Sequence, residues 1–139
     1  MSSERAGEVI RLLIAEDHPM VAVALESAFE LVDDVEIVGG TGSVADTVDA
    51  VDRVRPHVIL LDRRLRDGDG VEAIPALLAA SPGVRVLVFT GYADRAMADR
   101  VAEVGGAGLM LKRGLFDDLL VVIRRVAAGQ DCFDVDLRQ

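Results

Sequence analysis

Five residues with reactive or charged side chains directly follow short apolar segments of this chain or close them. They are Glu16, Asp17, Asp62, Thr90 and Lys112. Carboxylates that crowd together repel one another and become stable when a divalent cation lies among them, and oxygen ligands favour Mg²⁺, with Mn²⁺ as a second choice. An ammonium and a hydroxyl can bind a phosphoryl group, and an Asp carboxylate can accept one covalently. Brought together, these side chains would form a metal-dependent phosphoryl-transfer site.

The apolar segments are those expected of strands that are buried on both faces of a parallel sheet. They are rich in β-branched and aliphatic residues, and helical patterns separate them. The five segments are residues 12–15, 35–38, 58–61, 86–89 and 109–111. In a doubly wound α/β domain the carboxyl ends of parallel strands lie at one edge of the sheet, where ligands bind. This architecture would bring the five reactive residues into one crevice.

Five helices are predicted between and after these strands, because apolar residues recur there at helical spacing. We expect them at about residues 19–31, from Val44 after Ser43, from about Gly70, at 95–104 and at 115–128. Asp17 or His18 can cap the first helix, and Pro19 suits its first turn. Pro75 is awkward inside the third helix and would shift its start or bend it.

Five short strings carry a resemblance to a known family. They read IAEDH at 14–18, LLD at 60–62, DGDG at 67–70, FTGY at 89–92 and GLMLK at 108–112. In this order they resemble the receiver domain of two-component response regulators, over about residues 9–129. The residues of these motifs are most similar to those of regulators with a LuxR-type (NarL/FixJ) helix-turn-helix output domain. The resemblance implies a flavodoxin-like (βα)5 fold whose five parallel strands lie in the order 2-1-3-4-5.

The resemblance also assigns a role to each reactive residue by its place in the motifs. Asp62 corresponds to the phosphoacceptor, Thr90 to the switch hydroxyl and Lys112 to the ammonium that contacts the phosphoryl group. The implied partners are a sensor histidine kinase and an output domain or target protein. Such a protein is a signalling switch and not an enzyme with a separate substrate.

The metal site implied by the resemblance is built from oxygen atoms. Asp17 and Asp62 would bind Mg²⁺ directly and Glu16 through water, with the backbone carbonyl of Arg64 as a further ligand. His18 lies next to the acidic pair and is either a further metal ligand or a helix cap or surface contact.

The chain departs from the usual receiver pattern at three positions. Arg66 stands four residues after Asp62, where receivers usually have proline, and Leu109 replaces the usual tyrosine or phenylalanine. Arg113 follows Lys112 where many receivers have proline, so a cis peptide is not expected there. A leucine cannot move a polar-tipped ring between buried and exposed positions. These departures leave open a receiver-like module that signals without phosphate.

A second alternative is an Mg²⁺-dependent phosphohydrolase of related fold. That class of enzyme needs an acidic residue two positions after its nucleophilic Asp, as a general acid. Here the position holds Arg64, which favours the switch.

The region expected to respond to phosphorylation comprises the fourth helix, the fifth strand and the fifth helix. On it, Met97, Arg100, Val101 and Leu109 are the candidates for a partner or self-association surface. Because Leu109 is not aromatic, the expected rearrangement is small, and the protein would be a monomer or at most a weak dimer.

Length, composition and charge agree with one acidic domain. The 139 residues are 51% hydrophobic and carry a net charge of −9, which argues against direct contact with nucleic acid. No apolar stretch approaches the roughly 20 residues of a membrane span, and no signal region is evident, so a cytoplasmic location is expected. Cys132 is the single cysteine. Residues 1–8 are expected to be a flexible tail, 9–129 the domain, and 130–139 the start of a linker or a C-terminal tail.

Overall fold

The computed structural model describes residues 8–134. Residues 1–7 and 135–139 lie outside this range; they include most of the predicted N-terminal tail and half of the predicted segment 130–139. Within the described residues the sheet strands are β1 (Ile10–Ala15), β2 (Val35–Thr41), β3 (Val58–Leu61), β6 (Arg85–Thr90), β7 (Gly108–Leu111) and β8 (Cys132–Asp134). Two very short strands, β4 (Arg64–Leu65) and β5 (Gly68–Asp69), pair with each other as an antiparallel hairpin.

The main sheet is parallel throughout the described chain, in the order β2-β1-β3-β6-β7-β8. Its first five members are the five predicted strands, so the predicted order 2-1-3-4-5 is confirmed. The reversal of strand order between β1 and β3 is the point at which such a sheet offers a crevice.

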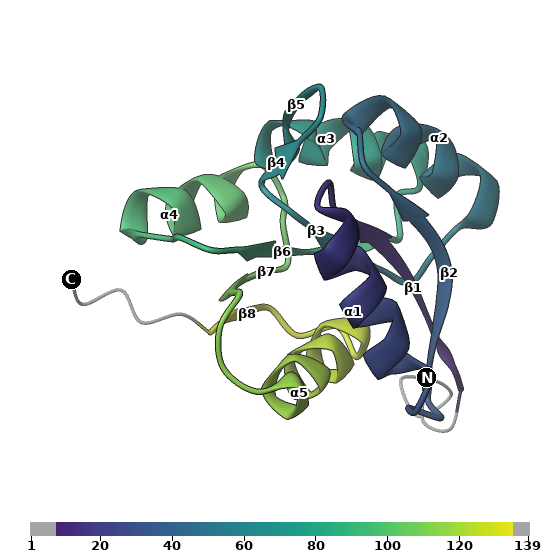
Figure 1. The fold of residues 1–139 in the computed structure, drawn as a ribbon. Coiled ribbons are helices and arrows are strands. Elements are labelled where there is room, and N and C mark those ends of the chain that lie inside the picture. The colour runs from purple at the N-terminus through teal and green to yellow at the C-terminus, as the bar shows by residue number, and fades with distance from the viewer. Residues whose placement is uncertain (1–7, 135–139) are drawn as a thin grey trace.

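Helices cover both faces of the sheet (Figure 1). They are α1 (Pro19–Phe29), α2 (Val44–Val54), α3 (Gly70–Ala80), α4 (Arg95–Glu103) and α5 (Phe116–Ala127). Leu12, Leu60 and Leu87 pack with α1 and α5, whereas Leu13 and Ile59 pack with α2, α3 and α4. Alternate residues of each strand therefore enter two separate apolar layers, which explains why the strand segments are apolar at nearly every position.

The helix bounds agree with the predicted ones to within two residues where both ends were predicted. Ser43 caps α2 by accepting a hydrogen bond from the backbone N–H of Asp46. The predicted side-chain cap of α1 is wrong, because His18 occupies the N-cap position without a capping hydrogen bond from its side chain. Pro75 lies inside α3, which nevertheless begins at Gly70.

The sixth strand, β8, was not predicted and lies in the segment expected to begin a linker. The backbone N–H of Cys132 donates to the carbonyl of Ala107 at 2.8 Å. Arg85 holds the approach to this strand, because its guanidinium donates to the carbonyls of Val126 at 3.0 Å and Gln130 at 2.8 Å. The chain after α5 therefore runs back to the sheet, where β8 pairs with β7 (Figure 1).

The close approach of β8 to β7 requires glycine at position 108. A Cβ atom there would lie 2.3 Å from the carbonyl oxygen of Cys132. We expect Gly108→Ala to lower the free energy of unfolding by about 1–3 kcal/mol and to expose the Cys132 amide to hydrogen exchange. Gly83→Ala is the matched control, since its Cβ would meet no atom within 4 Å. Equal stability and equal protection in both variants would show that β8 does not depend on this contact.

Candidate functional site

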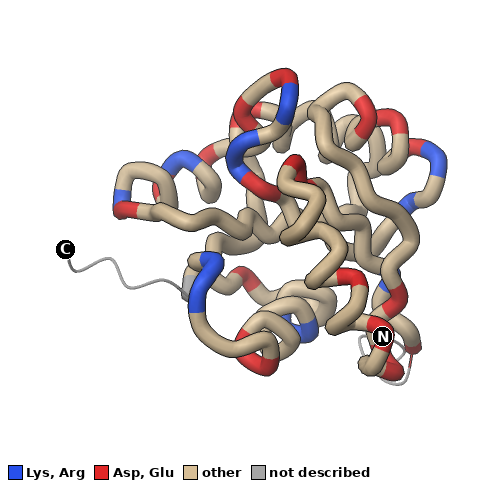
Figure 2. Tube along the Cα trace, in the orientation of Figure 1, with Lys and Arg blue, Asp and Glu red and all other residues tan. Residues whose placement is uncertain are grey.

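The predicted site residues lie at the carboxyl edge of the sheet because the strand hydrogen bonding continues past the strands. The N–H of Glu16 donates to Thr41, that of Asp62 to Ala15 and that of Lys112 to Thr90, at 2.7–2.9 Å. Charged residues otherwise lie mainly in the helices and in the loops that connect them to the strands (Figure 2). The prediction that residues after different strands meet at one edge is confirmed for Glu16, Asp62 and Lys112.

A buried ion-pair cluster joins Glu16, Asp62 and Lys112. The Lys112 ammonium lies 2.8 Å from Oε1 of Glu16 and 3.0 Å from Oδ2 of Asp62. The three side chains are 2%, 7% and 18% exposed, in the order Glu16, Asp62 and Lys112. The lysine also lies over the ring of Phe89, 5.9 Å from its centroid. One ammonium therefore neutralises part of two buried carboxylates.

The protonation states of this cluster are set by burial and by Lys112. Burial acts to raise the pKa of Glu16, but hydrogen bonds from Lys112 and from the His18 backbone outweigh it, so the pKa is lowered. Burial raises the pKa of Asp62; the Lys112 hydrogen bond only partly opposes this, and the charge of Glu16 adds to it. Burial acts to lower the pKa of Lys112, yet its two carboxylate partners raise it overall. Of the two carboxyl groups in the cluster, that of Asp62 is therefore the one whose ionised form is less favoured.

The donor set of the cluster fits a divalent cation. Among the described residues, Glu16, His18 and Asp62 each offer a ligand atom, and these atoms lie within 4.8 Å of one another. The raised pKa of Asp62, caused by burial and by the neighbouring Glu16 charge, is the signature of carboxylates that lack full neutralisation. Oxygen donors of this kind suit Mg²⁺.

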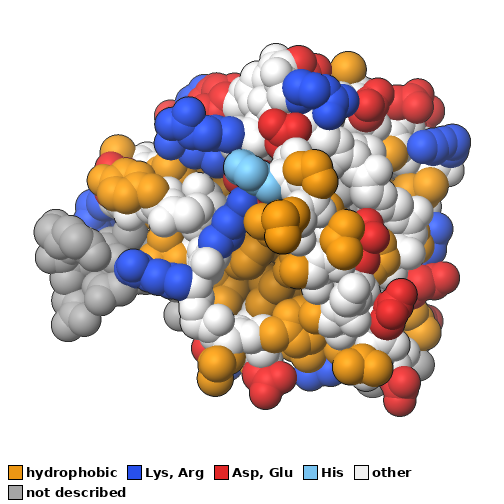
Figure 3. Space-filling model, in the orientation of Figure 1, with side chains coloured by type: hydrophobic (Ala, Val, Ile, Leu, Met, Phe, Trp, Pro, Cys, Tyr) orange, Lys and Arg blue, Asp and Glu red, His pale blue; other side chains and the backbone are white. Residues whose placement is uncertain are grey.

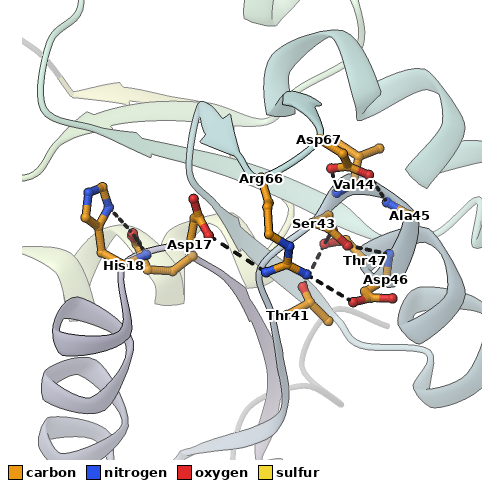
Figure 4. A network of polar contacts seen from close by, with 11 residues as sticks. Asp17, His18, Thr41, Ser43, Val44, Ala45, Asp46, Thr47, Arg66 and Asp67 are labelled. Carbon is orange, nitrogen blue, oxygen red and sulfur yellow. Dashed lines mark hydrogen bonds and ion pairs between the residues drawn. The ribbon is translucent and has the colours of Figure 1, made fainter.

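Asp17 does not join this cluster, although it is adjacent to Glu16 in sequence. Its Oδ1 faces the guanidinium of Arg66, 3.8 Å from Nη1 (Figure 4). The neighbouring His18 turns its Nδ1 to Glu16, at 3.1 Å from Oε2, and is mostly exposed. Sequence reasoning treated Asp17 as a direct ligand and gave no partner to Arg66.

Thr90 and Arg64 flank the cluster. Thr90 is buried at the end of β6, and its carbonyl accepts the Lys112 N–H. Arg64 directs its backbone N–H to Oδ1 of Asp62 through a long hydrogen bond of 3.5 Å. Arg64 therefore lies next to the carboxylate of Asp62, whereas Thr90 is connected to the cluster through the backbone of Lys112.

The DGDG segment at residues 67–70 is joined to two helices by its aspartates. Asp67 accepts hydrogen bonds from the backbone N–H groups of Val44 and Ala45 at the start of α2. Asp69 caps α3 by accepting from Val71 at 2.8 Å. The cap that Asp67 provides was missed, because a sequence signal for capping covers only residues next to the helix and not a loop brought there by the fold.

The predicted response surface is partly wrong. Val101 and Leu109 are fully buried in the layer beneath α4, so neither can form a surface patch. Met97 is partly buried against the same layer. Arg100 is exposed but engaged by ion pairs with Glu72 and Glu103. The alternation of β7 side chains explains the error, since Leu109 points into the sheet layer that α4 covers.

An apolar groove of about 480 Å³ adjoins the site. It runs between α1 and the start of α5 and is lined by Met20, Leu25, Phe89, Leu115 and Phe116, with Lys112 at its rim. Met20 and Leu115 are highly exposed. Figure 3 shows apolar side chains gathered in a hollow on this face. The charged cluster therefore opens beside a surface suited to protein side chains.

Comparison with known proteins gives one consistent family. The profile of the response regulator receiver domain matches residues 12–124. The DNA-binding transcriptional activator DevR/DosR of Mycobacterium tuberculosis is 32% identical over 127 residues, which are 91% of this chain and 58% of that protein. The response regulator VraR of Staphylococcus aureus is 27% identical over 92% of this chain and 61% of its own length.

Solved structures show the same fold. A LuxR-family two-component response regulator from Aurantimonas sp. SI85-9A1 has a TM-score of 0.87 at 22% identity, over 94% of this chain and 93% of that one. The receiver domain of the response regulator NarL from Mycobacterium tuberculosis has a TM-score of 0.83 at 25% identity, covering 88% of this chain and 99% of that one. This chain spans about three fifths of the length of the curated relatives DevR/DosR and VraR.

Proposed function

Because this chain belongs to the receiver domain family of response regulators, we propose that Asp62 is its phosphoacceptor. The observation that carries the assignment is the buried cluster in which one ammonium, that of Lys112, bridges Asp62 and Glu16 at the carboxyl edge of the sheet. A carboxylate held among oxygen ligands and next to a cation is arranged to accept a phosphoryl group.

In the proposed reaction an oxygen of Asp62 attacks the phosphorus of a phosphohistidine. The new P–O bond forms as the P–N bond breaks, and the leaving imidazole takes up a proton. Lys112 already contacts Asp62 at 3.0 Å, so it can remain beside the oxygens of the transferred group. Thr90, a buried residue at the end of β6, would donate its hydroxyl to the same oxygens. Movement of Thr90 and Lys112 would shift the loops after β6 and β7.

Glu16, Asp62 and Asp17 are the residues proposed to hold Mg²⁺, with the backbone carbonyl of Arg64. When bound, the cation supplies positive charge that offsets the charge of the phosphoryl oxygens. Asp17 must leave Arg66 to take part, because its carboxylate faces that guanidinium (Figure 4).

The proposed partners are a sensor histidine kinase and an output domain or target protein, and the proposed location of this protein is the cytoplasm. The apolar groove beside Lys112 supports a protein phosphodonor, because it offers side chains an apolar surface next to the charged cluster. DevR/DosR is named as a DNA-binding transcriptional activator, which supports control of transcription as the output. The acidic charge of −9 supports a role in which this chain does not bind nucleic acid itself. No helix in the described part of the chain is long and apolar enough to cross a membrane.

A single experiment separates the switch from a phosphohydrolase. The protein is incubated with acetyl phosphate and Mg²⁺, and its intact mass is measured; in parallel, turnover of p-nitrophenyl phosphate is followed. We expect a mass gain of one phosphoryl group and negligible turnover, because Arg64 occupies the position of a hydrolase general acid. Rapid turnover would support the hydrolase. Failure to gain mass with acetyl phosphate, together with negligible turnover, would support a phosphorylation-independent module.

A further inference from the structure

The guanidinium of Arg66 lies between two carboxylates that belong to different elements. Its Nη1 is 3.8 Å from Oδ1 of Asp17, in the loop after β1, and its Nη2 is 3.6 Å from Oδ2 of Asp46, in the first turn of α2 (Figure 4). Arg66 itself comes from the turn between β4 and β5. One cation therefore bridges the loop after β1 to the start of α2.

The backbone around Arg66 holds this position. The Arg66 N–H donates to the carbonyl of Gly42 at 3.0 Å, and the next residue, Asp67, caps α2. Gly42 also leaves space for the side chain, because a Cβ atom there would lie 2.9 Å from Nη1 of Arg66. The guanidinium of Arg66 therefore lies over Gly42, and the local backbone holds it beside Asp17.

The contact has a consequence for cation binding. Glu16 and Asp62 lie within reach of one ion, but Asp17 is outside their group and faces a guanidinium. Moving Asp17 toward a metal costs its attraction to Arg66, and a bound dication would in addition be repelled by the nearby guanidinium. Both effects weaken metal binding.

We propose that Arg66 is an internal counter-cation that competes with Mg²⁺ for Asp17 and so sets the metal affinity of the site. The inference rests on the proposed function, since it takes Asp17 as a metal ligand. When Asp17 turns to the metal, Arg66 keeps Asp46 as its partner. Metal occupancy is thereby linked to the junction of β2 and α2.

The expected size of the effect follows from the exposure of the pair. Asp17 is 38% and Arg66 61% exposed, so solvent screens their attraction. Exposed pairs contribute about 0.2–1 kcal/mol, which corresponds to a change in Kd of roughly 1.4- to 5-fold. Because the effect is electrostatic, it should shrink as ionic strength rises.

Two variants test the proposal by independent routes. Arg66→Gln removes the charge, and Gly42→Ala displaces the guanidinium while the net charge stays unchanged. The Kd of Mg²⁺ is measured by isothermal titration calorimetry at low and at high salt. We expect both variants to bind Mg²⁺ about 1.4- to 5-fold more tightly than the unaltered protein at low salt, with a smaller difference at high salt.

Arg63→Gln is the matched control. It removes the same charge from the same segment between β3 and α3, but its guanidinium faces Asp69, at 3.8 Å, and not Asp17. Its Kd is expected to equal that of the unaltered protein. Thermal unfolding without metal establishes that each variant is folded, and Gly42→Ala carries the test if Arg66→Gln is not.

The outcomes distinguish the two proposals. If Asp17→Asn leaves the Kd unchanged, or if the unaltered protein binds no Mg²⁺, the proposed metal site is wrong. The proposed role of Arg66 is then wrong as well. If Asp17→Asn weakens binding while Arg66→Gln and Gly42→Ala bind like the unaltered protein, the metal site stands and the competition by Arg66 is overturned. If Arg63→Gln lowers the Kd of Mg²⁺ by the same factor, the competition is also overturned, because removal of any nearby positive charge would then be enough to strengthen metal binding.

Discussion

Replacing Asp62 by asparagine will abolish phosphorylation by acetyl phosphate. An amide oxygen is a poor nucleophile, and removal of a nucleophile costs at least about 10³-fold in rate. Asparagine keeps the size of the side chain, which is buried and lies 3.0 Å from the Lys112 ammonium, so the surrounding packing should persist. Intact-mass measurement after incubation with acetyl phosphate and Mg²⁺ should show the phosphoryl gain in the unaltered protein and none in Asp62→Asn.

The control for this experiment is Asp52→Asn. Asp52 is exposed on α2 and pairs with Arg55, away from the cluster. It should gain one phosphoryl group at the unaltered rate. Labelling of Asp62→Asn equal to that of the control would exclude Asp62 as the acceptor.

The same substitution should stabilise the metal-free protein at neutral pH. Burial and the charge of Glu16 raise the pKa of Asp62 above its ordinary value of 3.8, so the folded state disfavours the ionised form. The penalty is full above the folded-state pKa, shrinks as pH falls through it and disappears below the unfolded value. We expect Asp62→Asn to increase the free energy of unfolding by on the order of 1 kcal/mol at pH 7, with no gain in acid. Urea unfolding at several pH values, with a chelator present, measures this difference.

Replacing Lys112 by methionine should have the second large effect. Glu16 and Asp62 would remain buried without their shared ammonium, so the pKa of both carboxyls should rise. Loss of one partner from a buried ion pair predicts a decrease of about 2 kcal/mol or more in the free energy of unfolding at neutral pH. Phosphorylation should slow by about 10²-fold or more, because a cation that stabilises the transferring group is lost.

Arg113→Met serves as the control for Lys112→Met. Arg113 is the next residue along the chain and is exposed, so the variant loses the same charge outside the cluster. Stability from urea unfolding and the rate of mass gain should both stay close to those of the unaltered protein. If both variants lose the same stability and the same phosphorylation rate, the positive charge of this loop matters and the contacts of Lys112 with Glu16 and Asp62 do not.

The arrangement of Glu16, Asp62 and Lys112 could be predicted because it depends on local patterns. Each of these residues follows an apolar segment whose pattern predicts a strand buried on both faces, as the structure has it. Parallel pairing then brings residues that are distant in sequence to one edge of the sheet. Once the strands are recognised, the meeting of Glu16 with Lys112 requires no knowledge of side-chain packing.

The strand β8 could not be predicted in this way. Cys132–Asp134 contains no apolar run, and its pairing depends on the absence of a Cβ atom at Gly108 and on the hydrogen bonds of Arg85. The expectation that Leu109 and Val101 belong to a response surface was wrong for a related reason. Motif positions say where a residue lies along the chain, whereas packing of α4 on the sheet decides which side chains reach the surface.

The partner of Asp17 shows most clearly where the sequence ceases to decide. The sequence determined that Glu16 and Asp17 lie together at the end of β1, beside the acidic site. Only the tertiary structure decided that Glu16 contacts Lys112 while Asp17 contacts Arg66. Consecutive residues at the end of a strand point in different directions. The partner of each side chain lies on a different loop, and the position of that loop is set by the tertiary fold and not by its place in the sequence.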